Sequence, residues 1–447
     1  MSDTATAPAA ITVDEAYGTI KRRRFALFGV LGAVFLYLAY AWISFGVTDL
    51  ILRSEPDRAV LLGTDSVAYK VHVFKNLRRD GLDVSIEGER RATYDREDWP
   101  DWVTPIDETD AEIDLGGGYR VVIAGPGFDF EVPDYGTISA ESGEDGISWT
   151  LPDGAEAPDW ASLNERKVDL RPTVFRRVQI TKTRIEVHRY FFGWENFWFP
   201  FDSPLRAYSF SEIMGLMVSG ERLDPEQSNF SLITGAFLSN PEWQHGHVFK
   251  ALGETILMAV LGTMTAVLVG LPLAFLAARN FTPSMAVRFA LRRIFDFLRG
   301  VDALIWSLIL IRAFGLGPLT GALAIALTDT GTLGKLFSEA LENVDNRQIE
   351  GVRATGAGQL QRYRFGVIPQ IMPVFISQGL YYLESNTRSA TVIGALGAGG
   401  IGLVLVETLR TSRDWENTLY IILLTVIVVV LMDQLSSWLR RRLITGE

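Results

Sequence analysis

The sequence predicts a mainly α, polytopic membrane protein with an inserted β-rich domain. Several apolar runs have about the 20 residues that a bilayer core requires. Between the first and the second of these runs lies a long stretch that shows the alternation of polar and apolar residues typical of strands. Hydrophobic residues make up 48% of the 447 residues and charged residues only 21%, so we expect a lipid bilayer and not a nucleic acid as the partner.

Charge is divided unevenly along the chain. Residues 46–249 hold 36 acidic and 20 basic side chains, and the rest of the chain holds 17 and 22. An acidic soluble insert in a mildly basic membrane frame would give this division. The absence of cysteine excludes disulfides and thiolate metal sites, and the sequence indicates no other metal or cofactor site.

The first transmembrane helix is expected at residues 25–45. Residues 1–24 are expected to form a disordered cytoplasmic tail, because their Ala-, Thr- and Pro-rich beginning has little to bury. The four cations from Lys21 to Arg24 directly precede the apolar run and place the N-terminus in the cytoplasm. The alternative is a cleaved signal peptide, since Ala39-Tyr40-Ala41 has the small-x-small form of a cleavage site.

A periplasmic β-rich insert and linker are expected over residues 46–248. Short segments of period two predict its strands, at 119–123, 128–132, 178–181 and 184–188. The aromatic cluster from Trp194 to Phe201 is expected to pack this domain or to lie at the bilayer interface, where Trp is enriched, and a partner-binding patch is the alternative. His245 and His247 precede the next span and are interpreted as interfacial, because no further metal ligands accompany them.

A second membrane domain is expected over residues 249–442. We predict its spans at about 251–277, 294–314, 319–337, 365–383 and 419–439. A cytoplasmic loop is expected at 342–364, and a re-entrant or outer segment at 388–409. With both termini inside, every strongly basic loop and the C-terminal arginines lie in the cytoplasm, as the positive-inside rule requires.

A polar and basic island at residues 350–369 separates two apolar segments. Glu350, Arg353 and Ala354 fall on one side of a helix. Gly356 then interrupts that helix, and a proline at the end of the island can begin the next one. The sequence therefore predicts a helix, a glycine break and a second helix.

This island resembles the EAA loop of ABC-importer permeases, and it matches that loop in spacing at Glu350, Gly356 and Pro369. It departs from the motif where Gly351 and Val352 replace the two alanines. The resemblance implies that the island couples the chain to an ATPase, through Glu350, Gly351, Arg353, Ala354, Gly356 and Ala357. An ordinary amphipathic connector between spans is the alternative.

A second signature, rich in glycine, occurs within residues 386–402. With the segments 274–280 and 297–300, it resembles the type I ABC-importer permease fold, and within that fold the phosphonate transporter permease family. The resemblance covers somewhat less than half of the chain and implies a core of five helices, to which the N-terminal helix and the β-rich insert are added. A nucleotide-binding loop is excluded here, because no strand precedes the glycines and no Lys follows them.

The resemblance implies a non-catalytic permease for phosphonates or related phosphorus oxyanions in the bacterial inner membrane. Its implied partners are two copies of an ABC ATPase, a periplasmic phosphonate-binding protein and a second permease copy, identical or a close paralogue. The chain itself has no Gly-x4-Gly-Lys-Ser/Thr motif with which to hydrolyse ATP. The alternative is a membrane-anchored sensor or assembly factor that acts through the acidic domain. Ionisable residues within the spans favour the permease, because each costs roughly 2.5 to 3.5 kcal/mol at a helix centre and an anchor does not need them.

Polar residues within the predicted spans or shortly after the span at 365–383 are the candidates for the substrate pathway: Asp302, Asp329, Asn386, Arg388, Ser389 and Thr391. Those from 386 to 391 precede the glycine-rich segment, and this order is typical of a half-helix that presents free N–H groups to an anion. Arg388 is the only cation there. The alternative is structural, with Arg388 paired with Glu384 one turn earlier.

Overall fold

The computed structural model describes residues 13–54, 56–79, 81–86, 93–219, 221–411 and 415–445. The chain divides into two compact units, Met1–Leu62 and Gly63–Glu447. The first twelve residues of the expected N-terminal tail lie outside the described residues.

The first unit is dominated by one long helix, α1 (Val13–Ser44). Its part from Lys21 to Ser44 is long and apolar enough to cross a membrane. Helical structure over residues 13–24 differs from the expected disorder, because the helix continues through the basic residues, which are good helix formers. Gly46, in the left-handed region with φ 59°, separates α1 from the short α2 (Val47–Leu52). Helix α3 (Pro56–Val67) leads into the second unit.

The second unit begins with two six-stranded antiparallel sheets. One has the order β2-β1-β12-β11-β10-β9, with strands at Leu82–Ile86, Ala68–Asn76, Arg184–Phe192, Arg176–Thr181, Lys167–Thr173 and Ala161–Asn164. The other runs from β3 to β8 in sequence order, with strands at Val103–Pro105, Ala111–Gly116, Tyr119–Ala124, Gly127–Val132, Gly136–Ser142 and Ile147–Thr150. A short 3₁₀ helix, η1 (Arg96–Asp98), precedes β3.

The inward faces of the two sheets share one hydrophobic core, so this domain is a β-sandwich. Val178 of β11 and Val187 of β12 lie opposite each other and are fully buried, whereas their polar neighbours alternate to the other face. The four predicted strand segments are confirmed in β5, β6, β11 and β12. The period-two pattern succeeds here because in each strand the residues that face the shared core are apolar and those on the other face are mainly polar.

The segment after the sandwich packs against the helices that follow it. It includes η2 (Pro204–Ala207), α4 (Phe210–Ser219) and α5 (Asn229–Leu238). Trp194 and Phe197 contact the rings of Trp243 and Tyr420, whereas Trp198 remains 54% exposed. The aromatic cluster is thus partly core and partly surface.

His245 does not lie at an exposed interface, as the sequence suggested. Its ring is buried, with one nitrogen 2.8 Å from the Tyr420 hydroxyl and the other 2.7 Å from the Phe197 carbonyl oxygen. His247 is exposed. These two hydrogen bonds therefore tie the first turn of the helix that begins at His245 both to the aromatic segment and to the long helix that contains Tyr420.

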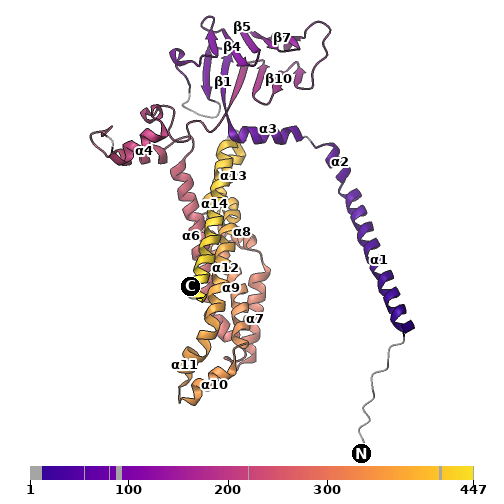
Figure 1. The fold of residues 1–447 in the computed structure, drawn as a ribbon, viewed down its shortest axis with the longest axis vertical. Coiled ribbons are helices and arrows are strands. Elements are labelled where there is room, and N and C mark those ends of the chain that lie inside the picture. Colours follow the sequence, from indigo (N-terminus) through magenta and orange to yellow (C-terminus); the bar gives the residue numbers. More distant parts are fainter. Residues whose placement is uncertain are drawn as a thin grey trace, which may run out of the picture. The chain divides into compact units, whose positions relative to one another are not determined.

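The helical domain contains α6 to α14 (Figure 1), at His245–Ala277, Met285–Gly300, Ala303–Phe314, Pro318–Glu342, Asn346–Ala354, Gln359–Arg362, Ile368–Ile393, Gly400–Thr411 and Trp415–Arg440. Among the described residues of the whole chain, three helices are long and apolar enough to cross a membrane, and a bent pair makes up to four. In this domain these are α6, α14 and the pair formed by α12 and α13, which is bent by 58°.

The expected continuous span over 294–314 is divided into two helices. Helix α7 ends at Gly300, and α8 begins at Ala303. The Asp302 side chain accepts a hydrogen bond from the Leu304 N–H at 2.8 Å, which makes Asp302 the N-cap of α8. This cap starts a new helix where a continuous helix was expected, and it gives Asp302 a structural role.

Glycines allow α9 to pack closely against both α6 and α7. A methyl group on Gly262 of α6 would lie 2.7 Å from Ile325 of α9, and one on Gly270 would lie 3.4 Å from Gly334. On another face of α9, a methyl group on Gly331 would lie 2.7 Å from the Arg299 backbone nitrogen of α7. Such close approach is how small residues hold helices together in membranes.

His188 of β12 is buried on the face of its sheet that points away from the sandwich core, opposite His72 of β1, with ring centroids 5.6 Å apart. Burial, followed by the nearby positive charges of His72 and Arg177, holds the pKa of His188 well below its ordinary value of 6.5. In the unfolded chain this histidine binds a proton below about pH 6.5. The unfolded state therefore binds more protons in this range, and stability falls as the pH falls.

We predict that lowering the pH from about 7.5 to about 5.5 lowers the hydrogen-exchange protection of the β11 and β12 amides by up to tenfold, or about 1.4 kcal/mol. Intrinsic exchange rates are corrected for pH, and His188→Gln should remove most of the loss. Burial opposes ionisation of Asp169, but hydrogen bonds from Arg177 and Lys167 lower its pKa to about 2, so it does not titrate in this window. An equal loss in His188→Gln would contradict this account.

Candidate functional site

The predicted helix, glycine break and second helix are present between α9 and α12. Helix α10 begins after Asp345, whose carboxylate accepts a hydrogen bond from the Arg347 N–H at 2.9 Å. Glu350 and Arg353 are exposed on α10, as are Gly351 and Ala354. These predicted coupling residues therefore form part of one accessible surface.

The turn after α10 depends on glycine. Gly356 has φ +82°, in the left-handed region, and Ala357 beside it is half-buried. The Gly358 N–H then donates to the Gln361 side chain at 2.9 Å at the start of α11. A π-helical turn, η3 (Tyr363–Val367), joins α11 to α12.

The two arms of this helical turn touch where Gly366 faces α10. A methyl group on Gly366 would lie 3.3 Å from the Ile349 Cα, so the backbones approach closely. Between the arms lies an open hollow of about 490 Å³, lined by Gly351, Val352, Thr355, Gly356, Ala357, Gln361 and Phe365. Phe365 in its lining is 60% exposed, and Leu360 on the neighbouring α11 is 80% exposed. A surface that exposes apolar side chains next to charged ones is typical of a protein-binding site.

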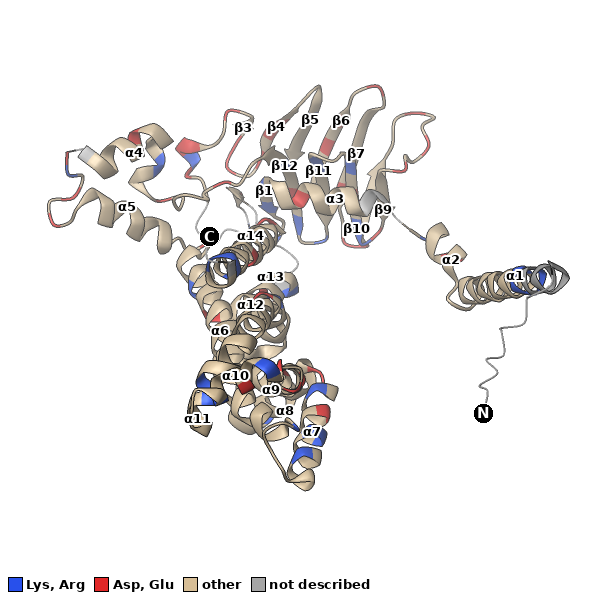
Figure 2. Ribbon diagram, turned by 60° about the horizontal axis from the view of Figure 1, so that its bottom comes forward, with Lys and Arg blue, Asp and Glu red and all other residues tan. Residues whose placement is uncertain are grey.

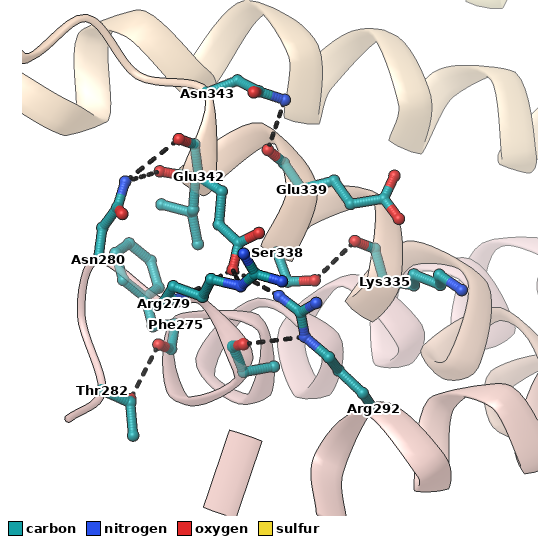
Figure 3. A network of polar contacts seen from close by, with 12 residues as sticks. Phe275, Arg279, Asn280, Thr282, Arg292, Lys335, Ser338, Glu339, Glu342 and Asn343 are labelled. Atoms are coloured by element: carbon teal, nitrogen blue, oxygen red, sulfur yellow. Dashed lines mark hydrogen bonds and ion pairs between the residues drawn. The ribbon is translucent and has the colours of Figure 1, made fainter. Parts of the chain in front are cut away.

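A polar network at the end of α9 supports this element (Figure 3). The Glu342 carboxylate accepts hydrogen bonds from the Arg279 backbone N–H at 2.7 Å and from the Arg292 guanidinium at 2.5 Å. The Asn280 amide donates to the carbonyl oxygens of Leu341 and Glu342. The network joins the end of α6, the side of α7 and the end of α9, four residues before α10 begins.

A second ion-pair network links α7 to α9 farther along. Asp296 accepts from Lys335 at 3.0 Å and from Arg299 at 3.1 Å, and it also pairs with Arg293 at 3.3 Å. Arg299 therefore pairs within its own helix, with Asp296, whereas Asp302 caps the next helix.

Two of the candidate pathway residues meet in the middle of the helical domain. The Asn386 amide group of α12 donates to Asp329 of α9 at 2.5 Å and to Thr263 of α6 at 2.8 Å. All three side chains are buried. Since one amide nitrogen has two hydrogens, both of its donors are used, and this polar cluster joins three helices.

The other candidates from α12 do not join this cluster through any contact among the described residues. Arg388 is 65% exposed and pairs with Glu384 at 3.7 Å, the structural alternative raised above. The hydroxyls of Ser389 and Thr391 donate to carbonyl oxygens one turn earlier in their own helix.

The expected half-helix N-terminus at 386–391 is wrong, because these residues continue α12. The helix N-terminus lies later, at Gly400, after a π-helical turn, η4 (Gly394–Ala398), and a kink in which Gly397 has φ +111°. There the Gly400 and Ile401 N–H groups donate to Glu254 at 3.2 Å and to Thr255 at 2.9 Å. A carboxylate of α6 therefore already occupies the position that an anion would favour.

Sequence reasoning missed Thr263, Glu254, Thr255 and Glu342. Glu254 could have been found, since it is an ionisable residue within an expected span and such residues need a partner. The two threonines carry no such signal, because threonine in a span normally bonds to its own helix. Among the described residues, no group of three or more His, Asp or Glu side chains is placed to hold a metal ion.

Residues 270–445 match the family described as binding-protein-dependent transport system inner membrane component. The chain is 40% identical over 191 residues to the phosphate-import permease protein PhnE of Mycolicibacterium smegmatis, across 43% of this chain but only 36% of that relative. It is 47% identical over 122 residues to PhnE2 of Escherichia coli, described as a cryptic phosphonate transport system permease protein, across 27% of this chain and 99% of that relative.

Among solved structures, the MetNI methionine ABC transporter in an inward-facing conformation aligns with a TM-score of 0.39 at 19% identity. The alignment covers 44% of this chain and 95% of that chain.

The buried cluster predicts strong coupling between two of its residues. Asp329→Leu removes the carboxylate that Asn386 contacts, and Asn386→Leu leaves a buried carboxylate without its amide donor, so each should destabilise the protein by about 1 to 3 kcal/mol. The double variant should cost less than the sum of the two, by about 0.5 to 3 kcal/mol. Thermal unfolding in detergent measures this cycle.

Thr332→Val is the matched control, because the Thr332 hydroxyl bonds only to its own helix, at the Thr328 carbonyl. It should change stability by less than about 0.5 kcal/mol. Strict additivity of the two leucine substitutions would show that the Asp329–Asn386 contact does not exist in the folded protein.

Proposed function

Because the chain belongs to the family of ABC-importer permeases, we propose that it is the permease subunit of an ATP-driven importer for phosphonates or related phosphorus oxyanions. The substrate class rests on one observation. Relatives that are 40% and 47% identical to this chain are named for phosphate import and for phosphonate transport. Coupling to a separate ATPase is part of the proposal, with two ATPase copies, a periplasmic binding protein and a second permease copy as partners.

The exposed surface of α10 and the hollow beside it are the proposed ATPase contact. Glu350 and Arg353 supply charges of both signs, and Leu360 and Phe365 supply apolar area that water would otherwise cover. Such a combination of an apolar centre and a charged rim is typical of protein interfaces. Small residues on this surface leave little side chain above the backbone, so that a partner can approach it closely. These residues are Gly351, Ala354, Gly356 and Ala357.

Charge supports the proposed topology. Lys and Arg gather on α7 and around α10 and α11 (Figure 2), and three further arginines lie at the end of α14 and directly after it, at positions 440–442. With α10 in the cytoplasm beside the ATPase, the positive-inside rule places both termini of the chain on that side and the sandwich in the periplasm. The bacterial inner membrane is the corresponding location.

Helix α9 is the proposed mechanical link between the membrane interior and the ATPase contact. It carries Asp329 at the buried cluster and Glu342 at its end, and α10 follows directly. Movement of the ATPase contact would therefore shift α9 together with α6 and α7, to which polar contacts fasten it. Rigid helices that move as units are the usual elements of such transitions.

Arg388 remains the proposed cation that admits the anion from the outer side, with Ser389 and Thr391 beside it. Its exposed guanidinium keeps donors available for an oxyanion. We propose a positioning role for Asp329, which orients Asn386, because a carboxylate repels an anionic substrate. Asp302, which caps α8, is proposed to act by holding the α7–α8 turn.

The coupling element, which consists of α10, the turn at Gly356 and α11, gives the first functional prediction. Gly356→Val should uncouple ATP hydrolysis from uptake, because a β-branched residue is strained at φ +82°. Glu350→Lys should weaken ATPase binding by charge reversal. Uptake and ATPase activity are measured in proteoliposomes that contain the partner subunits.

Gly253→Ala, outside the proposed ATPase contact, is the control, because a methyl group at Gly253 meets nothing within 4 Å and its backbone lies within helix α6. It should retain uptake within about twofold, since alanine suits a helix at least as well as glycine does. Full uptake by both Gly356→Val and Glu350→Lys would remove this element from the coupling mechanism.

Arg388 gives the second functional prediction. Arg388→Gln should lower uptake at least tenfold, or about 1.4 kcal/mol, while assembly and basal ATPase activity persist, because a pair this exposed contributes at most about 1 kcal/mol to stability. Glu384→Gln breaks the same pair and serves as the matched control, which should retain uptake. Equal loss in both variants would assign the pair a structural role instead.

A further inference from the structure

A short helical hairpin, formed by α4 and α5, precedes the first long helix of the helical domain. Each helix has 10 residues, or about 15 Å of length, too short to cross a bilayer core of about 30 Å. The inward faces pack on each other and on the preceding segment, through Ile213, Ile233, Leu205 and Phe199. The core of the hairpin is therefore complete without its outward faces.

The outward faces are apolar along their length. On α4, Phe210, Met214 and Val218 follow each other at intervals of four and are 64%, 44% and 82% exposed. On α5, Phe230 and Leu238 are 58% and 46% exposed. Side chains of this size at helical spacing leave a continuous apolar stripe on α4 and apolar ends on α5.

A groove of about 440 Å³ extends the α4 stripe toward the aromatic segment. Phe210 and Met214 line it together with Phe237 of α5 and the exposed Trp198. Trp198 is the type of residue that collects at the boundary between lipid and water. The apolar surface is thus continuous from α4 to the aromatic cluster.

Contacts within the chain place the hairpin beside the start of α6, one of the helices apolar enough to cross a membrane. The Phe237 ring of α5 stacks on His245 in the first turn of α6, with centroids 4.0 Å apart. A methyl group on Gly246 would lie 2.7 Å from the Leu238 carbonyl oxygen, so the end of α5 touches α6 directly. The hairpin therefore lies at the level where α6 meets the edge of the bilayer.

Charge supports the same orientation. Helix α5 contains no charged residue (Figure 2), and Glu212, the only one in α4, bonds to Ser209 at the start of that helix. The connection between the helices holds Glu221, Arg222, Asp224 and Glu226, which favour water. A hairpin lying flat in the interface would keep this connection at the headgroups and turn the stripe toward acyl chains.

We propose that the α4–α5 hairpin is a membrane-interfacial element, whose α4 stripe contacts the acyl chains of the leaflet where α6 begins. Lipid suits this surface because the stripe carries no hydrogen-bonding side chain to recognise a protein. The groove beside it reaches Phe237, whose ring lies 6.4 Å from that of the exposed Phe249 on the spanning helix α6. The hairpin fixes the depth of the junction between the sandwich and the helical domain.

The chain has no cysteine, so single cysteines can report the depth of each position in the full-length protein. Val218→Cys carries a bimane fluorophore in vesicles of phosphatidylcholine with or without brominated acyl chains. Leu268→Cys, on the exposed apolar side of α6, is the lipid reference, and Asp153→Cys, on a sandwich turn, is the water reference. Glu226→Cys tests the charged connection.

We expect brominated lipid to quench the bimane fluorescence at position 218 by at least half as much as at position 268. Aqueous iodide should quench the fluorescence at position 218 only a little. Positions 153 and 226 should show the reverse. Met214→Cys, on the same stripe, must agree with position 218, which protects the result against a local effect of either substitution. Iodide quenching at 218 equal to that at 153 would overturn the proposal. Protection of 218 from both quenchers would also overturn it, because a protein surface would then cover the stripe.

Discussion

Close packing of α9 against α6 and α7 is the constraint on which the helical domain depends. Gly262 and Gly331 bring the helices into near backbone contact, at distances that any side chain would violate. Because lipid gives helices no hydrophobic reason to associate, this close contact and the polar groups behind it must hold them together. The positions of the buried cluster and of the Glu342 network follow from it.

Helix α9 consequently connects the two parts of the candidate site. The Asp329–Asn386 contact fixes its middle to α12, and Glu342 fixes its end to α6 and α7. The coupling element begins a few residues later and projects beyond these contacts, with its charged and apolar side chains exposed. A partner that moves α10 therefore acts on a helix whose neighbours are already fastened to it.

Local patterns predicted much of the fold. Alternation fixed the strands of β5, β6, β11 and β12, and the left-handed requirement at Gly356 gave the break after α10. The failures involve a local helix cap at Asp302 and partners distant in sequence. Apolarity alone predicts one helix over residues 294–314, whereas the Asp302 cap divides this segment into two helices. The sequence also predicts a helix start at residues 386–391, whereas Asn386 contacts Asp329 and Thr263 from within a continuous helix. No local pattern shows that Glu254 reaches Gly400.

The central claim is that this chain conducts phosphorus oxyanions at the expense of ATP hydrolysed by a partner. Its most direct measurement uses proteoliposomes that contain the full-length chain, its ATPase and its binding protein, supplied in turn with a phosphonate, phosphite, phosphate and sulfate. The account predicts that at least one phosphorus oxyanion stimulates ATP hydrolysis and accumulates inside, whereas sulfate does neither. An assembled complex that hydrolyses ATP without responding to any phosphorus oxyanion would contradict it.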